Sequence, residues 1–196
     1  MSNVKLSAAE LALACNADIL LTKNSVVSKV YDLFGHLSQS FLQQANQFSL
    51  PAEVLKTSPK ISRGENYHGL PWVMLDYPRL FSGNDIFSVR TMFWWGNYFS
   101  QFILLKGEMI PAGVSQRIVD QLSGDQHFLC TGTDPWQHHF TETNMAVISQ
   151  QSQQEINSQV AQSGFLKLGT KIPIERWESV ENFMTASFDT FLKIAT

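Results

Sequence analysis

The sequence predicts an α+β domain built on a mostly antiparallel sheet, and three observations lead to this fold class. Helical spacing of apolar residues fills the segment 7–49, short β-rich runs divided by turn residues fill 60–106, and strands alternate with helices in 107–196. Helices followed by a run of strands and then by mixed elements are typical of α+β proteins. A chain of 196 residues is usually one domain. We therefore expect a single domain, and a sheet of four strands or more.

Two helices are expected in the N-terminal segment. Ser7 and Glu10 form a capping box, in which each side chain binds the other residue's free backbone amide, so a helix should begin there. The residues Thr-Lys-Asn at 22–24 interrupt the apolar pattern and suit a turn followed by a second N-cap. The second helix should then run from Val26 to a point before Pro51, because the apolar residues in between follow the 3.6-residue period.

A loop and a three-stranded meander are expected next, with the meander at 72–106. Residues 62–71 contain two glycines and a proline and predict the loop. Strands are predicted at 72–77, 86–94 and 98–106, where Val, Ile, Trp, Tyr and Phe suit a pleated surface. The dipeptide Gly96-Asn97 predicts a two-residue hairpin loop. An uninterrupted strand over 86–105 with a glycine bulge is the alternative.

The C-terminal part should alternate helices with short strands. Pro111 favours a helix start. Further expected elements are a short strand at 127–131, a loop at 132–144, a strand at 165–172 and a last helix after Pro173. The segment 145–160 is so polar that it predicts a solvated helix at most.

Composition excludes several classes of function. Charged residues make up only 16% of the chain, and a net charge of −3 gives no reason to expect a nucleic acid as partner. The sequence contains no run of about 18 apolar residues, which a membrane-spanning helix would need. The two cysteines, Cys15 and Cys130, lie in no CxxC pair, and the polar residues among the first 21 argue against a secretory signal. We therefore expect a cytoplasmic protein without a cofactor, and the sequence allows a homo-oligomer without determining one.

The hairpin at 86–106 has one face of mixed character. If its loop has two residues, Arg90 lies opposite Ile103, and each side chain is thereby assigned to a face. One face carries a plain core set: Phe87, Val89, Thr91, Phe93, Trp95, Tyr98, Ser100, Phe102 and Leu104. The other carries Ile86, Ser88, Arg90, Met92, Trp94, Phe99, Gln101, Ile103 and Leu105. On this second face an arginine, a glutamine and an indole amide need hydrogen-bond partners if they are covered.

Three interpretations of this mixed face stay open. The first, which we favour from sequence, is that helices cover both faces and Arg90 pairs with Asp76 or another carboxylate. The second is a pocket in which Arg90 holds a carboxylate or phosphate in a forked contact. The third is an interface with a partner protein, anchored by the same arginine and tryptophan. The predicted ligand-binding residues are Tyr67, Arg90, Trp94, Phe99 and Gln101.

Two further clusters contain groups able to do chemistry. His68 in a glycine-flanked loop, with Asp76 and Arg90, could perform acid-base chemistry. His127, His138 and His139 are candidate metal ligands, but no HxH or HxxxH spacing occurs and adjacent histidines point apart, so no metal is predicted.

The leading functional hypothesis is a non-catalytic binding or interaction domain that uses the sheet region 65–105. Its partner would be a small anionic ligand or another protein. The alternative is an enzyme that uses His68, Asp76 and Arg90 on a small anionic substrate. Motifs for nucleotide binding, serine hydrolysis and zinc proteolysis are absent from the sequence.

Overall fold

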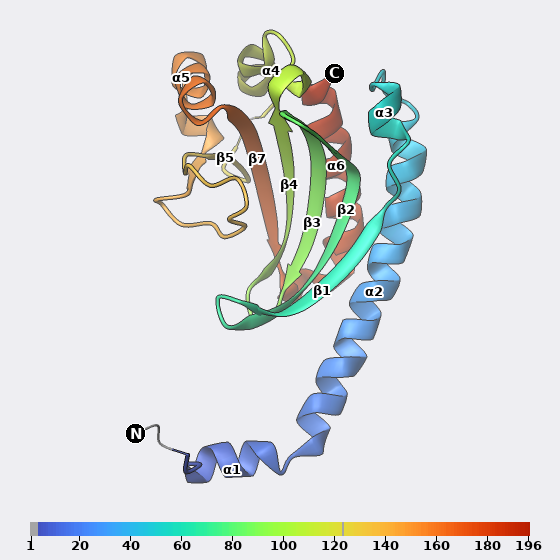
Figure 1. Ribbon diagram of the computed structural model, residues 1–196, viewed down its shortest axis with the longest axis vertical. Coiled ribbons are helices and arrows are strands. Elements are labelled where there is room, and N and C mark those ends of the chain that lie inside the picture. Colours follow the sequence, from blue (N-terminus) through green and yellow to red (C-terminus); the bar gives the residue numbers. More distant parts are fainter. Residues whose placement is uncertain (1–3, 123) are drawn as a thin grey trace.

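A seven-stranded antiparallel sheet forms the centre of the molecule (Figure 1). The computed structural model describes residues 4–122 and 124–196. The strands lie in the order β1-β2-β3-β4-β7-β5-β6. Their bounds are β1 (Lys60–Tyr67), β2 (Leu70–Ser82), β3 (Asp85–Trp94), β4 (Tyr98–Lys106), β5 (His127–Cys130), β6 (Met145–Val147) and β7 (Phe165–Pro173). Helices precede and follow the meander β2-β3-β4, which confirms the predicted α+β class and the antiparallel sheet.

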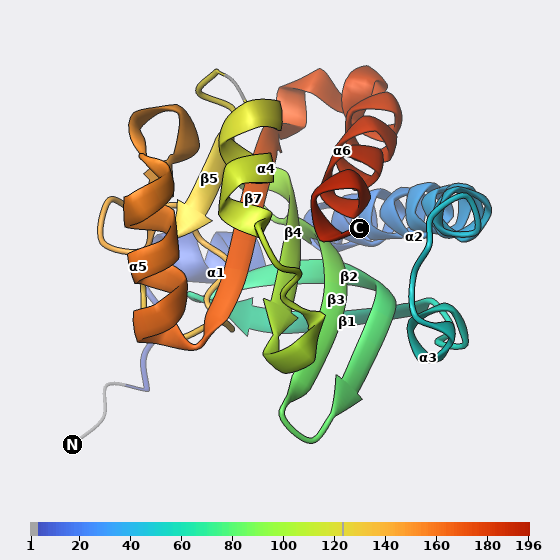
Figure 2. The ribbon, with the colours of Figure 1, turned by 90° about the horizontal axis from the view of Figure 1, so that it is seen from above.

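The helices gather mainly on one face of the sheet. They are α1 (Ala8–Ala14), α2 (Ala17–Ala45), α3 (Ala52–Leu55), α4 (Val114–Gln121), α5 (Gln153–Ser163) and α6 (Val180–Ala195), with 3-10 turns η1 (Gly107–Met109), η2 (Ile148–Gln150) and η3 (Ile174–Ser179). Figure 2 shows α2 and α6 side by side on that face. Between them the rings of Phe41 and Phe188 stack with centroids 4.1 Å apart. A single hydrophobic cluster joins this helical layer to the sheet, from Val27 to Ile194.

The N-terminal helices differ from the sequence-based expectation in one respect. The capping box of Ser7 and Glu10 begins α1 as predicted. However, α2 continues through residues 22–24, where a break was predicted. Local turn and capping preferences are weak compared with tertiary packing. The packing of α2 against the core from Val27 onward stabilises the helix, and the helix extends N-terminally through these residues. Residues 17–26 have no buried side chain, and the first part of this segment projects from the body together with α1 (Figure 1). Lys23 pairs with Glu65 of β1 and Val26 packs against the core, so α2 meets the body from there onward.

The predicted loop at 62–71 is wrong, because β1 occupies most of it. Gly64 does not make a turn there. A Cβ atom on Gly64 would lie 2.6 Å from the ring of Trp72 on the paired strand, so the glycine allows the indole to lie over the backbone. The turn itself is confined to His68 and Gly69, whose φ angles are 51° and 80°.

The hairpin between β3 and β4 has a three-residue loop, and the predicted two-residue loop is wrong. Trp94 pairs with Tyr98, so Trp95 lies in the loop with Gly96 and Asn97. The Asn97 amide donates to the Trp94 carbonyl at 3.0 Å, and Gly96 takes the positive φ of 71° that this β-turn requires. The extra residue shifts β4 by one position, so every β4 side chain lies on the face opposite to the predicted one.

The C-terminal elements largely follow the prediction. Strands β5 and β7 and the final helix lie where expected, and β7 inserts between β4 and β5. The segment 145–160 is not one helix. It contains β6, then η2, and then α5, which begins at a second capping box made by Ser152 and Glu155. Only Ile156 of α5 is buried, which agrees with the predicted solvated character.

Candidate functional site

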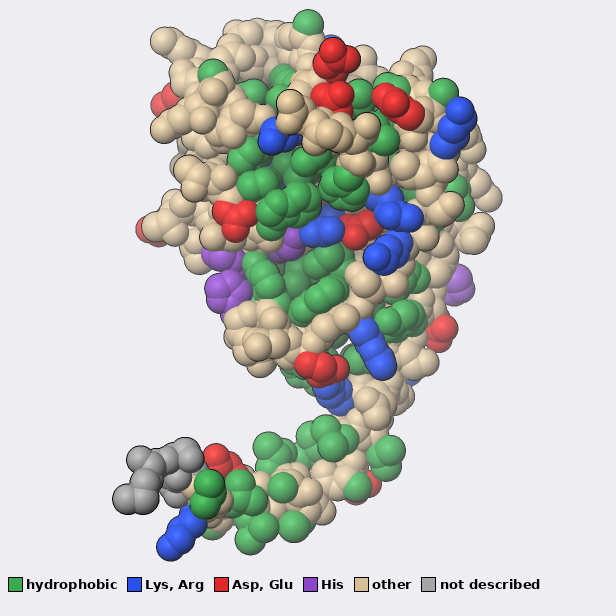
Figure 3. Space-filling model, viewed as in Figure 1, with side chains coloured by type: hydrophobic (Ala, Val, Ile, Leu, Met, Phe, Trp, Pro, Cys, Tyr) green, Lys and Arg blue, Asp and Glu red, His purple; other side chains and the backbone are tan. Residues whose placement is uncertain are grey.

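The second face of the sheet, here called the open face, is covered by a loop and not by a helix layer. Residues 131–144 connect β5 to β6 and cross this face. Figure 3 shows apolar side chains on both sides of a band of charged groups on this side of the molecule. The favoured expectation that helices cover both faces is therefore wrong, because the loop takes the place of the second helical layer.

Asp76 and Arg90 form an ion pair at the centre of the open face. They are register partners on β2 and β3. The guanidinium makes a forked contact, with Nε 2.6 Å from Oδ1 and Nη2 3.1 Å from Oδ2 of the carboxylate. This geometry gives the strongest hydrogen bonding available to an arginine and a carboxylate. The predicted pairing of these two residues is confirmed.

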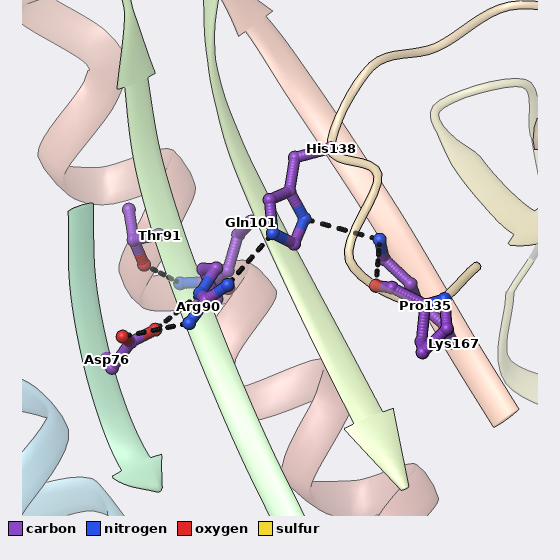
Figure 4. A network of polar contacts seen from close by, with 7 residues as sticks. All are labelled: Asp76, Arg90, Thr91, Gln101, Pro135, His138 and Lys167. Atoms are coloured by element: carbon purple, nitrogen blue, oxygen red, sulfur yellow. Dashed lines mark hydrogen bonds and ion pairs between the residues drawn. The ribbon is translucent and has the colours of Figure 1, made fainter. Parts of the chain in front are cut away.

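Lys167 of β7 is the least expected group on this face. Its side chain is almost completely buried, at 1% exposure, and no carboxylate of the described residues lies within ion-pair distance of it. The ammonium nitrogen instead donates to the carbonyl oxygens of Pro135, at 2.9 Å, and of Gln137. Lys167 thus holds the backbone of the 131–144 loop onto the sheet (Figure 4).

His138 lies between the two basic groups and determines how they share protons. Arg90 Nη1 is 2.9 Å from His138 Nε2, and a guanidinium only donates, so Nε2 must accept. A neutral imidazole then carries its proton on Nδ1, which lies 3.2 Å from Lys167 Nζ. A neutral amine would accept this hydrogen bond and donate its own two protons to the loop carbonyls. All donors and acceptors are therefore matched when Lys167 is neutral, whereas a protonated Lys167 places N–H against N–H.

Burial and mutual repulsion shift the titration of these groups in the direction that this pattern requires. Burial lowers the pKa of Lys167 from 10.5 to about 8, and Arg90 adds to the effect. Burial, followed by the nearby Lys167 and Arg90, lowers the pKa of His138 well below its usual 6.5. We name Asp76, Arg90, His138, Lys167 and the carbonyls of Pro135 and Gln137 the Lys167 network. Three basic side chains in it share one carboxylate.

A small cavity of about 10 Å³ borders the network. Its lining consists of Ser88, Arg90, Phe102, Leu104, Pro135, Trp136, His138 and Lys167. Arg90 uses three of its five N–H groups in hydrogen bonds. The Ser88 hydroxyl has no hydrogen-bond partner among the described residues. The accessible wall of the cavity is almost entirely apolar, and these donors with unused capacity belong to residues that border it. Trp136, which is 45% exposed, also lines the cavity.

Two tyrosines bind the backbone of the 131–144 loop at His138 and Phe140. Tyr67 Oη accepts from the His138 amide at 2.6 Å and lies 3.1 Å from His139 Nδ1, and Tyr98 Oη accepts from the Phe140 amide at 3.3 Å. Burial raises the pKa of Tyr67, and it raises that of Tyr98 to about 12, so both hydroxyls keep their protons at neutral pH.

Of the predicted ligand-binding residues, the structure brings three together on the open face. Trp94 Nε1 donates to the Tyr67 carbonyl at 3.1 Å, and both residues lie beside the loop that covers Arg90. Phe99 and Gln101 point to the helical face because of the register shift. Phe99 packs in the main core, and Gln101 Nε2 donates to Thr91 Oγ1 at 3.0 Å. The prediction that Arg90, Trp94, Phe99 and Gln101 share one face is therefore wrong.

The acid-base candidates are not brought together either. His68 lies at the tip of the β1-β2 hairpin, where its ring contacts those of Tyr67, Trp94 and His139. Within the described residues no hydrogen bond or ring contact joins His68 to Asp76 or Arg90.

The three histidines considered as metal ligands occupy separate surroundings. His127 is buried in β5, and its Nδ1 has no hydrogen-bond partner. His138 lies within the Lys167 network, and His139 packs edge-to-face against His68 at the hairpin tip. Among residues 4–122 and 124–196, no group of three His, Cys, Asp or Glu side chains is arranged to hold a metal ion.

Sequence reasoning missed Lys167, although one signal pointed to it. The strand Phe-Leu-Lys-Leu at 165–168 places a single lysine within an apolar run, and alternation assigns it to the face opposite Leu166 and Leu168. A charged residue inside a central strand requires polar partners. Those partners come from a loop about thirty positions earlier, which the local pattern does not reveal.

Comparison with known proteins found no match among protein-family models, curated proteins or solved structures. None of the helices in the described ranges combines the length and apolar character needed to cross a membrane.

Proposed function

We propose that this protein is a non-catalytic binding protein for a small anionic ligand, and that the ligand is held on the open face of the sheet. The observation that carries the proposal is the excess of basic groups in the Lys167 network, where the buried Lys167 and His138 and the half-buried Arg90 share one carboxylate. Clusters of buried groups with perturbed pKa values mark functional sites more often than other positions.

The basic groups that border the cavity favour an anion. An anion next to Lys167 would favour the protonated ammonium, and its oxygens could take the place of the loop carbonyls as acceptors. The two unused N–H groups of Arg90 and the Ser88 hydroxyl would provide further donors. Phe102 and Leu104 would accommodate an apolar substituent. The expected ligand is a small carboxylate with a short apolar part.

Entry of such a ligand requires movement of the loop. The cavity of about 10 Å³ has room for roughly one water molecule and not for a carboxylate. Its roof is made by Pro135 and the half-exposed Trp136 in a connecting loop, and loops open at lower cost than sheets. The 131–144 loop would therefore move away from the sheet when the ligand enters.

The experiment is a ligand-induced stabilisation measurement. Acetate and butyrate, at millimolar concentrations and constant ionic strength set with chloride, should raise the melting temperature of the wild type. Lys167→Met should abolish this response. Lys171→Met is the matched control, because Lys171 lies on the same side of β7 and contacts the rings of Tyr98 and Phe140 outside the cavity. A Lys167→Met protein that responds like the control would contradict the proposal, as would a wild type that responds to neither anion.

A partner protein is the second candidate occupant of the open face. Phe81 and Trp136 are 47% and 45% exposed, and their rings lie 6.0 Å apart on this side. Aromatic residues of this kind anchor protein interfaces. The acid-base alternative has less support, because Asp76 and Arg90 bind each other and His68 lies apart from both. The two unpaired cysteines, of which Cys15 is exposed, support a location in a reducing compartment such as the cytoplasm.

A further inference from the structure

The N-terminal arm, residues 4–21, carries most of the apolar surface that the molecule exposes. Seven of the ten large apolar side chains that are exposed among the described residues lie in it. They are Val4, Leu6, Leu11, Leu13, Ile19, Leu20 and Leu21. Their exposed fractions run from 46% for Ile19 to 88% for Val4. Figure 3 shows apolar side chains over much of this arm, away from the body.

Helix α1, which makes up much of the arm, is too short to be stable on its own. Helix α1 has seven residues and no buried side chain. Isolated helices shorter than about 12 residues are marginal in water, and the caps at Ser7 and Asn16 add only about 1 kcal/mol each. Packing against another surface would supply the missing stabilisation.

The arm's area and charge favour a protein surface. Its seven apolar side chains expose on the order of 700 Å², which exceeds the largest patch of most monomers and approaches the roughly 800 Å² that one partner contributes to a standard interface. The arm carries one basic residue, Lys5, and two acidic ones, Glu10 and Asp18. Helices that lie on membranes have a Lys- and Arg-rich polar face, which the arm lacks.

A second copy of the chain fits best, because the chain carries a receiving surface as well as the arm. Two hollows flank the half-buried Trp95 where α2 leaves the body. One, of about 340 Å³, is lined by Val26, Phe93, Trp95, Ile174 and neighbours, and the other, of about 300 Å³, includes Ile19 and Trp95. A chain with both an apolar projection and an apolar hollow can pair with its copy around a two-fold axis, which is the commonest symmetry of oligomers.

We propose that residues 4–21 are a dimerisation arm, which packs on a second copy of this chain. In this dimer the leucines of each arm bury against the arm and the Trp95 hollows of the other copy. The interface lies on α1, the exposed start of α2 and the β3-β4 loop. It does not involve the Lys167 network, so the proposal stands independently of anion binding.

The test is sedimentation velocity of the full chain at micromolar concentrations. The wild type should sediment as a species of twice the 22.1 kDa chain mass. Leu11→Ser with Leu20→Ser should raise the dissociation constant by at least about a hundred-fold, because each substitution removes two buried side chains from a symmetric dimer. Val119→Ser is the matched control, since Val119 is 41% exposed on α4, and it should leave the dimer intact.

Folding of the variants can be checked separately from association. Near-UV circular dichroism reports the packed tryptophans of the body. Apart from the contribution of Trp95, which the dimer would cover, the signal should be retained in the double variant, because Leu11 and Leu20 are exposed and lie outside the core. A wild type that remains monomeric would overturn the proposal. If that monomer cosediments with phosphatidylcholine–phosphatidylserine vesicles, the arm serves a membrane surface, and if it does not, the arm serves a different protein. A double variant that still dimerises would overturn the proposal as well.

Discussion

Replacement of Lys167 by Met should make the stability of this protein depend on pH in a different way. The folded pKa of Lys167 is about 8, below the 10.5 of the unfolded chain. Folding therefore releases a proton between these two values, and the stability of the wild type rises with pH across this window. Below about pH 8 the folded and the unfolded states both bind the proton. The buried ammonium then lowers the free energy of unfolding by its full amount. Methionine has no proton to lose and removes this dependence.

The size of this pH dependence follows from the lowered pKa of Lys167. The buried amine lowers the free energy of unfolding of the wild type by about 3 kcal/mol at about pH 7 and by about 1 kcal/mol at about pH 10. Methionine also leaves two loop carbonyls without donors, at about 1–3 kcal/mol each, but this loss is the same at both pH values. The wild type should therefore gain about 2 kcal/mol relative to Lys167→Met between about pH 7 and about pH 10.

Urea unfolding followed by tryptophan fluorescence measures this difference. Other titrating groups, such as Tyr98, are present in both proteins and largely cancel in the comparison. Lys171→Met should show a smaller change, because Lys171 is exposed on β7 and its pKa is lowered only by partial burial. A stability difference between wild type and Lys167→Met that does not vary with pH would refute the reasoning.

Three further substitutions test the sheet and its loop. Asp76→Asn should cost about 1.5–3 kcal/mol in urea unfolding, because it weakens two charge-assisted hydrogen bonds of the half-buried Arg90. A loss below about 0.5 kcal/mol would show that the pair does not stabilise the sheet. Tyr67→Phe should cost about 1–3 kcal/mol and speed hydrogen exchange in the 131–144 loop, whereas Tyr77→Phe, whose hydroxyl has no hydrogen-bond partner in the described structure, should leave that exchange unchanged. Gly169→Ala should destabilise the sheet by about 1–3 kcal/mol, because its Cβ would lie 2.7 Å from the Phe102 ring. The control Gly35→Ala in α2 has open space around the new Cβ and should stabilise the protein by up to about 1 kcal/mol. Equal effects of the two substitutions would contradict the described packing.

The fold class could be predicted because local patterns and the global fold agree along most of the chain. The stripe of apolar residues from Val26 lies against the core, and the strands of the meander follow from alternation. The alternation along β3 also placed Arg90 and Trp94 correctly on one face. Agreement between the local sequence pattern and the tertiary fold is what makes a fold class predictable from one sequence.

The errors arose where a backbone detail or a distant partner decided the outcome. One additional loop residue, Trp95, inverted the faces of β4, since the side-chain period of a strand is two. Gly64 resembled a turn residue but serves the approach of an aromatic ring. The partners of Lys167 lie in the 131–144 loop, and the sequence around Lys167 does not indicate that this loop crosses the sheet. The candidate site therefore became visible only with the fold.

A direct test of the binding account is the pKa of Lys167, measured by NMR titration of lysine labelled with ¹³C at Cε. The resonance is assigned by its loss in Lys167→Met. The account predicts titration near the value of about 8, and a clear upward shift when butyrate is present, because an anion beside the ammonium favours its protonated form. A Lys167 that titrates at the ordinary value of 10.5, or whose pKa is unchanged by the anion, would contradict the account.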